Sequence, residues 1–380
     1  MAIIGVIRET APGERRVALV PADAGKLHLS GLDVLVESGA GAGARHDDEA
    51  YATAGARVAG RAQVYAESDI LLCLRPPDDL EALRGGQILV GLLAPLADAR
   101  VPERLAAAGV TAISLDLLPR TLSRAQAMDA LTSQANVAGY KAALMAADAY
   151  GGFLPMLVTA AGTTRPARVL VLGAGIAGLQ AIATARRLGA VVTGYDVREA
   201  ARDDIASTGA SVLRLDAPAA AGEGGYARRL TEAEAAQQQQ ALDDAVAGFD
   251  IVITAAQVPG GRPPLLVTSD AVDRLRPGAV VVDLAAGPHG GNVAGSEPGR
   301  TVVTPRGVTL IGAADLAARV PEAASTAYSR NVCSLLATLV RDGVPAIDPQ
   351  DEVHTAVVVT HRGRITHPRV AAALAEEVTS

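Results

Sequence analysis

Three glycines at the spacing G-x-G-x-x-G lie near the middle of the 380-residue chain, in a position where they could bind a diphosphate. Gly173 allows a tight turn, Gly175 lets a diphosphate approach the backbone, and Gly178 lets the following helix pack closely on the preceding strand. The aliphatic run Val169–Leu172 precedes the turn, and a helix is expected over Ile176–Leu188. The start of that helix offers unpaired N–H groups and the positive end of its dipole. The pattern predicts a dinucleotide-binding βαβ unit.

An acidic residue, Asp196, ends the second apolar strand of this unit, about 20 residues after the turn. Its carboxylate would accept hydrogen bonds from both hydroxyls of an adenosine ribose and would repel a 2′-phosphate. Val197 and Arg198 follow it. Arg198 could hold a 2′-phosphate, but we expect its side chain to be solvated and to lie over the adenine. The sequence therefore favours NAD(H) over NADP(H).

A polar cluster, residues 119–134, precedes the glycine-rich turn. A long helix is expected from Ala125 through Tyr150, because this stretch has no proline and many alanines. On such a helix Gln126, Asp129 and Ser133 would share one face. With an arginine, these side chains could hold a ribose and a carboxamide by hydrogen bonds, but they include no general acid at neutral pH. The cluster favours hydride transfer between two carriers that need no protonation.

Other chemistry has little support in the sequence. The six histidines are scattered, and His289, after a strand end, is the best candidate for proton transfer among them. No spacing of histidines or cysteines predicts a metal site. Cys73 and Cys333 lie in apolar patterns and are expected to be buried, reduced thiols. The net charge of −7 argues against a nucleic-acid partner. We expect a soluble polypeptide, since no apolar run approaches the roughly 20 residues that span a bilayer as a helix.

Short apolar strands alternate with helical stretches along the whole chain, which is typical of parallel α/β sheets. The length exceeds that of one compact core and predicts two domains. We expect an α/β fold of two Rossmann-like domains with parallel sheets, joined by long helices. Residues 1–133 plus 320–380 would form an N-terminal α/β domain completed by the C-terminal segment, and 134–319 a nucleotide-binding domain. The expected strands are Ile3–Ile7, Val34–Glu37, Ile70–Leu74, Ile88–Leu92 and Thr111–Ser114, then Val169–Leu172, Val191–Tyr195, Ser211–Leu213, Ile251–Thr254, Val280–Asp283 and Thr309–Ile311.

Three further segments have distinct patterns. A helix over Ala323–Arg341 is expected to return the chain to the first domain, and residues 357–365 should form a small hairpin. Between Ala217 and Gln240 a glycine-rich stretch leads into a polar helix that should end in four glutamines. This segment is either a solvent-exposed loop and helix or a mobile flap with Tyr226 at its tip.

These motifs resemble the NAD(H)-binding component, domain I, of proton-translocating nicotinamide nucleotide transhydrogenases. The resemblance extends over essentially the whole chain. Its most specific parts are Ser123–Leu131 and the element Gly224-Gly225-Tyr226-Ala227. The other matching segments are Arg15–Pro21, Ala138–Tyr140, Thr159–Thr163, the glycine-rich turn, Asp283–Ala286, Gly290–Asn292 and the chain from Gly312 onward.

The resemblance implies that an arginine, a glutamine and an aspartate hold the nicotinamide end of NAD(H). Gln126 and Asp129 match the glutamine and the aspartate, and Thr132 matches a neighbouring hydroxyl. The arginine matches Arg120, or Arg124 if one extra residue in this chain shifts the register.

The resemblance also implies further contacts and partners. Gly225 and Tyr226 match a mobile loop that closes over the nucleotide, and Gln257 stands where that family usually has leucine. Ile176 and Val197 complete the expected cofactor contacts. The implied assembly is a homodimer with a membrane-spanning proton-channel subunit and a subunit that binds NADP(H). The chain would be cytoplasmic, peripheral on the inner face of the cytoplasmic membrane, and would pass hydride between NADH and NADP⁺ on its partner, coupled to proton movement.

Two alternatives remain open. Alanine dehydrogenase is related in fold, and Arg15 or Arg16 resembles its substrate-carboxylate arginine. Its essential lysine falls at Arg75 and its histidine near Ala94-Pro95. Because an arginine does not readily release a proton, imine chemistry lacks an evident base. The second alternative, a non-catalytic NAD-sensing subunit, would have lost the polar cluster, whereas Gln126 and its neighbours are retained.

Overall fold

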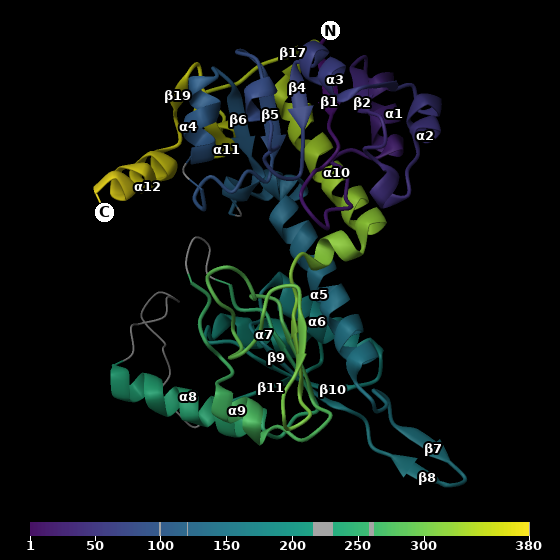
Figure 1. Ribbon diagram of the computed structural model, residues 1–380, viewed down its shortest axis with the longest axis vertical. Coiled ribbons are helices and arrows are strands. Elements are labelled where there is room, and N and C mark those ends of the chain that lie inside the picture. Colours follow the sequence, from purple (N-terminus) through teal and green to yellow (C-terminus); the bar gives the residue numbers. More distant parts are fainter. Residues whose placement is uncertain (99, 120, 216–230, 258–261, 380) are drawn as a thin grey trace. The chain divides into compact units, whose positions relative to one another are not determined.

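The computed structural model describes residues 1–379 except 99, 120, 216–230 and 258–261. The chain divides into two compact units, Met1–Gln134 with Ala318–Ser380 (unit 1) and Ala135–Ala317 (unit 2). Each unit is a parallel-dominated β-sheet covered by helices (Figure 1). The expected α/β class with two Rossmann-like sheets is confirmed. Among the described residues, no helix combines the length and apolar character that crossing a membrane requires.

The sheet of unit 1 has the strand order β19-β18-β6-β5-β4-β1-β2-β3. The strands β1 to β6 run parallel to one another. Their order reverses between β1 and β4, so the carboxyl ends of these two strands form a topological switch point, where ligands bind in open α/β sheets. The strands are β1 (Ile3–Val6), β2 (Asp33–Glu37), β3 (Arg57–Ala59), β4 (Ile70–Leu72), β5 (Ile88–Gly91), β6 (Thr111–Ser114), β18 (Val358–His361) and β19 (Arg364–Ile365).

The C-terminal segment completes this sheet. The expected hairpin at 357–365 is confirmed as β18 and β19, and β18 pairs antiparallel with β6. The sheet is therefore mixed at one edge rather than wholly parallel. A separate two-stranded ribbon, β16 (Val340–Arg341) with β17 (Val344–Pro345), follows the last long helix.

Apolar side chains cover both faces of the unit 1 sheet, because successive residues of a strand point to opposite faces. Leu72 packs in the cluster that includes Leu335 of helix α10, and Leu71 in the cluster that includes Tyr65 and Leu105 on the other face. The helices of unit 1 are α1 (Pro21–Leu29), α2 (Asp48–Thr53), α3 (Arg61–Glu67), α4 (Arg100–Ala107), α10 (Pro321–Leu339), α11 (Glu352–Val357) and α12 (Pro368–Thr379).

The sheet of unit 2 has the order β11-β10-β9-β12-β13-β15-β14, with only β14 antiparallel to its neighbour among the described strands. Its switch point lies between β9 and β12. The strands are β9 (Arg168–Leu172), β10 (Val191–Tyr195), β11 (Ser211–Val212), β12 (Ile251–Thr254), β13 (Val280–Asp283), β14 (Thr301–Val303) and β15 (Thr309–Gly312). The helices are α6 (Ile176–Arg187), α7 (Ala200–Ser207), α8 (Glu232–Val246), α9 (Ser269–Arg274) and the greater part of α5 (Ala130–Ala149).

A hairpin that the sequence did not predict projects from unit 2, formed by β7 (Leu157–Thr159) and β8 (Gly162–Thr164) (Figure 1). Residues 151–164 contain no charged side chain. Phe153, Met156 and Val158 are 56%, 60% and 71% exposed. An uncharged, apolar hairpin in this position is a candidate contact surface.

The expected long helix begins later than predicted. Ser123–Met128 form a 3₁₀ helix, η4, and α5 starts only at Ala130. Asp129 separates the two because its carboxylate accepts hydrogen bonds from the backbone N and the hydroxyl of Thr132, at 2.8 and 2.6 Å. It therefore acts as the N-cap of α5. The expectation that Gln126, Asp129 and Ser133 share one helical face is wrong.

Two other helix predictions needed correction. The polar helix α8 does not end in the four glutamines but continues through them to Val246, after a capping box formed by Thr231 and Glu234. The glycine-rich stretch before it falls mostly within 216–230, outside the described residues. The returning helix α10 begins at Pro321, two residues earlier than expected, because proline is well suited to the first turn.

Candidate nucleotide-binding site

The glycine-rich turn of unit 2 connects β9 to α6. Gly173 has a φ of +96°, and a Cβ on it would lie 2.9 Å from both the carbonyl carbon of Ala255 and the amide nitrogen of Ala256. A Cβ on Gly178 would clash with the carbonyl oxygen of Gly173. These two glycines are therefore required by the close approach of backbone to backbone. Their role is packing at the switch point.

Gly175 differs from the other two glycines. Its φ of −78° and ψ of −171° are open to any residue, and no atom of the described residues lies within 4 Å of the place where its Cβ would stand. It is the N-cap of α6, and in the described part of the chain no side chain caps that helix start. The first amide groups of α6 are thus available to an anion, and Ile176 beside them is 39% exposed. The turn has the space and the donors that a dinucleotide diphosphate requires.

Asp196 lies at the carboxyl end of β10, next to the turn. One oxygen of its carboxylate accepts a hydrogen bond from the Ala174 amide at 2.8 Å, and the other from the Arg198 amide at 2.9 Å. Burial raises the pKa of this carboxyl, but the hydrogen bonds from the Arg198 side chain and from the two amides outweigh it and hold the pKa below its usual value. The group is a fixed anion beside the turn.

Arg198 is exposed to solvent, as expected, but it is also paired. Its Nε and Nη2 each lie 3.0 Å from one oxygen of the Asp196 carboxylate, in a bidentate pair that the sequence did not predict. Val197 between them is 45% exposed.

Gln257 follows β12 and is exposed, and its Nε2 donates to the carbonyl oxygen of Leu284 at 3.1 Å. It therefore belongs to the segment that crosses next to Gly173. Gly225 and Tyr226, the two expected residues of the closing loop, lie outside the described residues.

The polar cluster lies in unit 1. Gln126 is exposed on η4, and its side chain has no hydrogen-bond partner among the described residues, whereas Asp129 and Thr132 pair with each other. Arg124 forms a bidentate ion pair with Asp351, at 2.8 and 2.9 Å, which holds the pKa of that carboxyl well below its usual value. Arg120, the other candidate arginine, lies outside the described residues.

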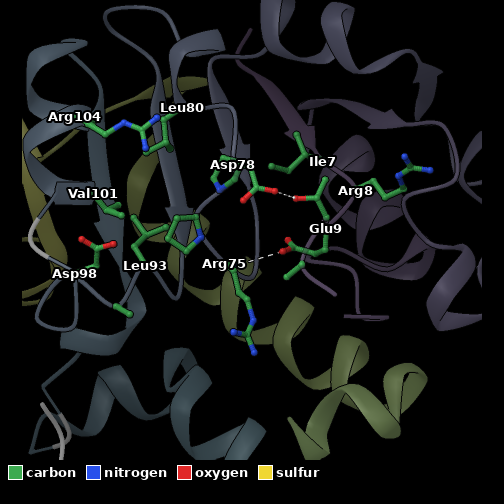
Figure 2. Close-up of a pocket in the computed structure, with 15 residues that line it drawn as sticks. Ile7, Arg8, Glu9, Arg75, Asp78, Leu80, Leu93, Asp98, Val101 and Arg104 are labelled. Carbon is green, nitrogen blue, oxygen red and sulfur yellow. Dashed lines mark hydrogen bonds between the residues drawn. The ribbon is translucent and has the colours of Figure 1, made fainter. Parts of the chain in front are cut away.

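A pocket of about 340 Å³ opens at the switch point of unit 1, beyond the ends of β1, β4 and β5. Figure 2 shows the Glu9 carboxylate turned toward the backbone at Arg75. Its oxygens accept hydrogen bonds from the Leu74 amide at 2.6 Å and from the Arg75 amide at 3.3 Å. Burial raises the pKa of Glu9 to about 7, despite the Leu74 hydrogen bond, and the charge of Glu14 adds to the rise.

Sequence reasoning missed Glu9. The available signal was an acidic residue just beyond an apolar strand, the pattern that identified Asp196. Arg16, the possible carboxylate-binding arginine, is 7% exposed. Its Nε donates to Glu14 at 2.7 Å and its Nη1 to Gln134 at 2.8 Å, so intramolecular acceptors already surround it.

The remaining candidates are histidine and cysteine side chains. His289 is exposed on the loop after β13, and among the described residues no group of three or more histidines, cysteines or acidic residues is placed to hold a metal ion. Both cysteines are free thiols. Cys73 is buried as expected, but Cys333 is only half-buried, because it lies near the solvent-facing side of α10.

Comparison with known proteins identifies relatives along nearly the full chain. Residues 5–138 match the family model "Alanine dehydrogenase/PNT, N-terminal domain" and residues 142–368 the model "Alanine dehydrogenase/PNT, C-terminal domain". The chain is 39% identical over 378 residues to an NAD(P) transhydrogenase subunit alpha polypeptide of Rhodospirillum rubrum, covering 96% of this chain and 98% of that protein. It is 41% identical over 373 residues to NAD(P) transhydrogenase subunit alpha of Cereibacter sphaeroides, covering 96% and 71%.

Two further relatives are a solved transhydrogenase structure and an alanine dehydrogenase sequence. The crystal structure of transhydrogenase from Sinorhizobium meliloti superposes with a TM-score of 0.84 at 39% identity, covering 97% of this chain and 99% of that one. Alanine dehydrogenase of Mycobacterium tuberculosis is 31% identical over 379 residues, covering 97% and 95%. The chain is thus more similar to these transhydrogenase subunits than to this dehydrogenase.

Proposed function

Because the chain belongs to the alanine dehydrogenase/PNT family, we propose that it is the NAD(H)-binding component of a proton-translocating transhydrogenase. It passes hydride between NADH and NADP⁺ held by a partner subunit. The observation that carries the proposal is the open Gly175 turn on the uncapped start of α6, beside the fixed anion Asp196. The higher identity to transhydrogenase alpha subunits supports it.

The residues of unit 2 hold the adenine half of NAD(H) in this proposal. Gly173, Gly175, Ile176 and Gly178 form the turn that receives the diphosphate. Asp196 accepts the ribose hydroxyls, with Val197 and Arg198 at its rim. To make this contact, the ribose displaces the Arg198 side chain from the Asp196 carboxylate. Gly225, Tyr226 and Gln257 complete the enclosure.

The polar cluster, residues 119–134, is assigned to the nicotinamide end. Gln126 supplies its amide, which has no partner in the described part of the chain, to the carboxamide, and Asp129, Thr132 and either Arg120 or Arg124 supply the other hydrogen bonds. The Arg124–Asp351 pair already occupies one of these two arginines, which favours Arg120. Bound NADH supplies the hydride, so these side chains orient the ring and move no proton.

The partners follow from the same assignment. The chain operates on the inner face of the cytoplasmic membrane, with an NADP(H)-binding subunit and a membrane-spanning subunit that conducts protons. It forms a homodimer, and the uncharged β7–β8 hairpin, with Val158 and its apolar neighbours exposed, is the surface that meets the second copy.

The decisive experiment mixes the purified chain with an NADP(H)-binding transhydrogenase component. We expect the chain alone to bind NADH, measured by the fluorescence of NADH. We expect the mixture to catalyse cyclic transhydrogenation. Rapid NADH oxidation by the chain alone with pyruvate and ammonium would contradict the proposal.

A second candidate function is an amino-acid dehydrogenase resembling alanine dehydrogenase. The unit 1 pocket next to Glu9 and Arg75 favours it, because it offers space for a small substrate at a switch point. The arginine at position 75 and the enclosed Arg16 guanidinium count against it. The same pyruvate assay separates the two functions.

The variant Gln126→Asn tests the role of the polar cluster. Shortening this side chain by one methylene keeps the amide but moves it away from a bound carboxamide. We expect hydride transfer to fall about tenfold or more while the Kd for NADH changes less than about threefold. An equal loss in both quantities would show that Gln126 does not orient the ring.

A further inference from the structure

Asn292 is a wholly buried amide that none of the assignments above uses. It is 0% exposed and lies on the loop after β13. Its Oδ1 accepts a hydrogen bond from the Ala256 amide at 3.1 Å, and its Nδ2 donates to the carbonyl oxygens of Ala256 at 2.9 Å and Pro264 at 2.7 Å. Both amide protons and the oxygen are therefore engaged with the backbone of one segment.

That segment is the one that leaves β12 next to the glycine-rich turn. The amide of Ala255 donates to the carbonyl oxygen of Leu172 at 2.7 Å, and the peptide between Ala255 and Ala256 stands directly against Gly173. Asn292 pairs with the backbone N–H and the backbone C=O of Ala256, as a residue of a neighbouring β-strand would, and so holds the backbone here in place. A shift of the peptide would change the space beside the turn.

The backbone around Asn292 is itself anchored. Its carbonyl oxygen accepts hydrogen bonds from the amides of Leu266 and Val267 at 2.8 and 2.9 Å. The next amide, of Val293, donates to the carboxylate of Asp283 at 3.1 Å, and a side chain on Gly291 would clash with that same carboxylate. The backbone on both sides of Asn292 is thus held by hydrogen bonds, so its side chain extends from a fixed position.

We propose that Asn292 is a positioning residue of the dinucleotide site, which sets the place of the Ala255–Gln257 segment beside the Gly173 turn. It makes no contact with the nucleotide and acts through Ala256. The inference rests on the proposed NAD(H) binding, because it assigns a role within that site. It extends the site to a residue on the loop after β13.

Replacing the side chain tests this inference. Asn292→Ala removes all three hydrogen bonds and leaves the Ala256 amide and carbonyl without this partner in a partly buried place. We expect the Kd for NADH to rise about tenfold, and the NMR signals of the Gly173 and Ala256 amides to shift.

Asn292→Asp keeps the size and the acceptor but turns an oxygen toward two carbonyl oxygens. Since a protonated carboxyl can donate one hydrogen bond, its NADH affinity should recover toward that of the wild type between about pH 8 and about pH 6. This variant also tests the inference if Asn292→Ala does not fold. A merely structural role predicts no such recovery of affinity.

Thr360→Val is the matched control. Thr360 is also 0% exposed and bridges two backbone groups, accepting from the Ala112 amide at 3.0 Å and donating to the Val110 carbonyl at 2.8 Å, but in unit 1. We expect it to lower the melting temperature without changing the Kd for NADH.

The outcomes distinguish the positioning role from the proposed function. If the wild type binds NADH and both Asn292 variants bind it as tightly, the positioning role is wrong and the proposed function stands. If Thr360→Val weakens binding as much as Asn292→Ala, the loss reflects general destabilisation and the role is again wrong. If the wild type does not bind NADH, the proposed function fails and the inference falls with it.

Discussion

At the scale of single residues, the three glycines of one motif have different physical duties. Gly173 and Gly178 lack side chains because backbone atoms occupy the space where a Cβ would stand. Gly175 has ordinary dihedral angles and open space at its Cβ position among the described residues, so none of them requires a glycine there. A glycine at such a position, at the start of a helix with no side-chain cap, is explained by a ligand that needs the space.

This difference gives a matched pair of variants. Gly175→Ala should leave the melting temperature nearly unchanged but raise the Kd for NADH about tenfold or more, because the methyl group enters the space of the diphosphate. Gly178→Ala should destabilise the fold by about 1–3 kcal/mol through overpacking. Thermal unfolding and NADH titration measure the two effects. Normal NADH binding by Gly175→Ala would show that no diphosphate lies there.

At the scale of elements, several side chains join one secondary-structure element to the next. Asp129 ends η4 and caps α5, and Glu9 ties the chain after β1 to the chain after β4. Both residues are acidic and both lie in or near candidate sites. The structural role of each residue is therefore separated from a chemical role by substitutions that preserve only one of the two roles.

For Asp129, the useful comparison is between asparagine and alanine. Asparagine caps a helix about as well as aspartate, so Asp129→Asn should keep the free energy of unfolding within about 0.5 kcal/mol, whereas Asp129→Ala should lower it by about 0.5–2 kcal/mol. If the charge also holds the nicotinamide end, both variants should slow cyclic transhydrogenation. Full activity of a stable Asp129→Asn would leave the residue with capping alone.

For Glu9, the raised pKa of about 7 predicts a pH-dependent stability. The folded state holds the proton more tightly than the unfolded state, whose value is near 4.5. The stabilisation is therefore fully present below about pH 4.5 and is lost as the pH rises through about 7, with at most about 3 kcal/mol at stake.

Glu9→Gln should remove this dependence. We expect the variant to be more stable than the wild type at about pH 8 and close to it at about pH 5, measured by urea unfolding. Glutamine keeps one oxygen that can accept the Leu74 hydrogen bond. Parallel stability curves for the two proteins across this range would show that Glu9 titrates normally.

At the scale of the whole molecule, the proposed dimer requires that a second copy of the chain cover the β7–β8 hairpin. The segment 151–164, which contains this small hairpin, has three exposed apolar side chains and no charge, so it gains stability when it is covered. Isologous contacts put the same surface of both copies together, so one charge per chain introduces two like charges at the interface.

Val158→Asp should therefore shift the protein from dimer to monomer, measured by sedimentation. Val303→Asp on the edge strand β14 is the control, since Val303 is 64% exposed against 71% for Val158. We expect the control to remain dimeric. A dimeric Val158→Asp with unchanged affinity would exclude the hairpin as the surface of association.

The sequence by itself determined the features that depend on neighbours in the chain. Hydrophobic runs marked β9, β10, β12 and β13 nearly to the residue, because a buried parallel strand must be apolar on both faces. The glycine spacing and Asp196 marked the turn for the same local reason.

Only the tertiary structure decided which distant groups share each environment. The pKa of Glu9 depends on its burial beside the chain that follows β4, and the hydrogen bonds of Ala256 depend on Asn292 from the loop after β13. A linear pattern does not contain these contacts, because parallel strands bring together residues separated by a whole helix. Packing across the sheet, rather than local preference, supplies that information.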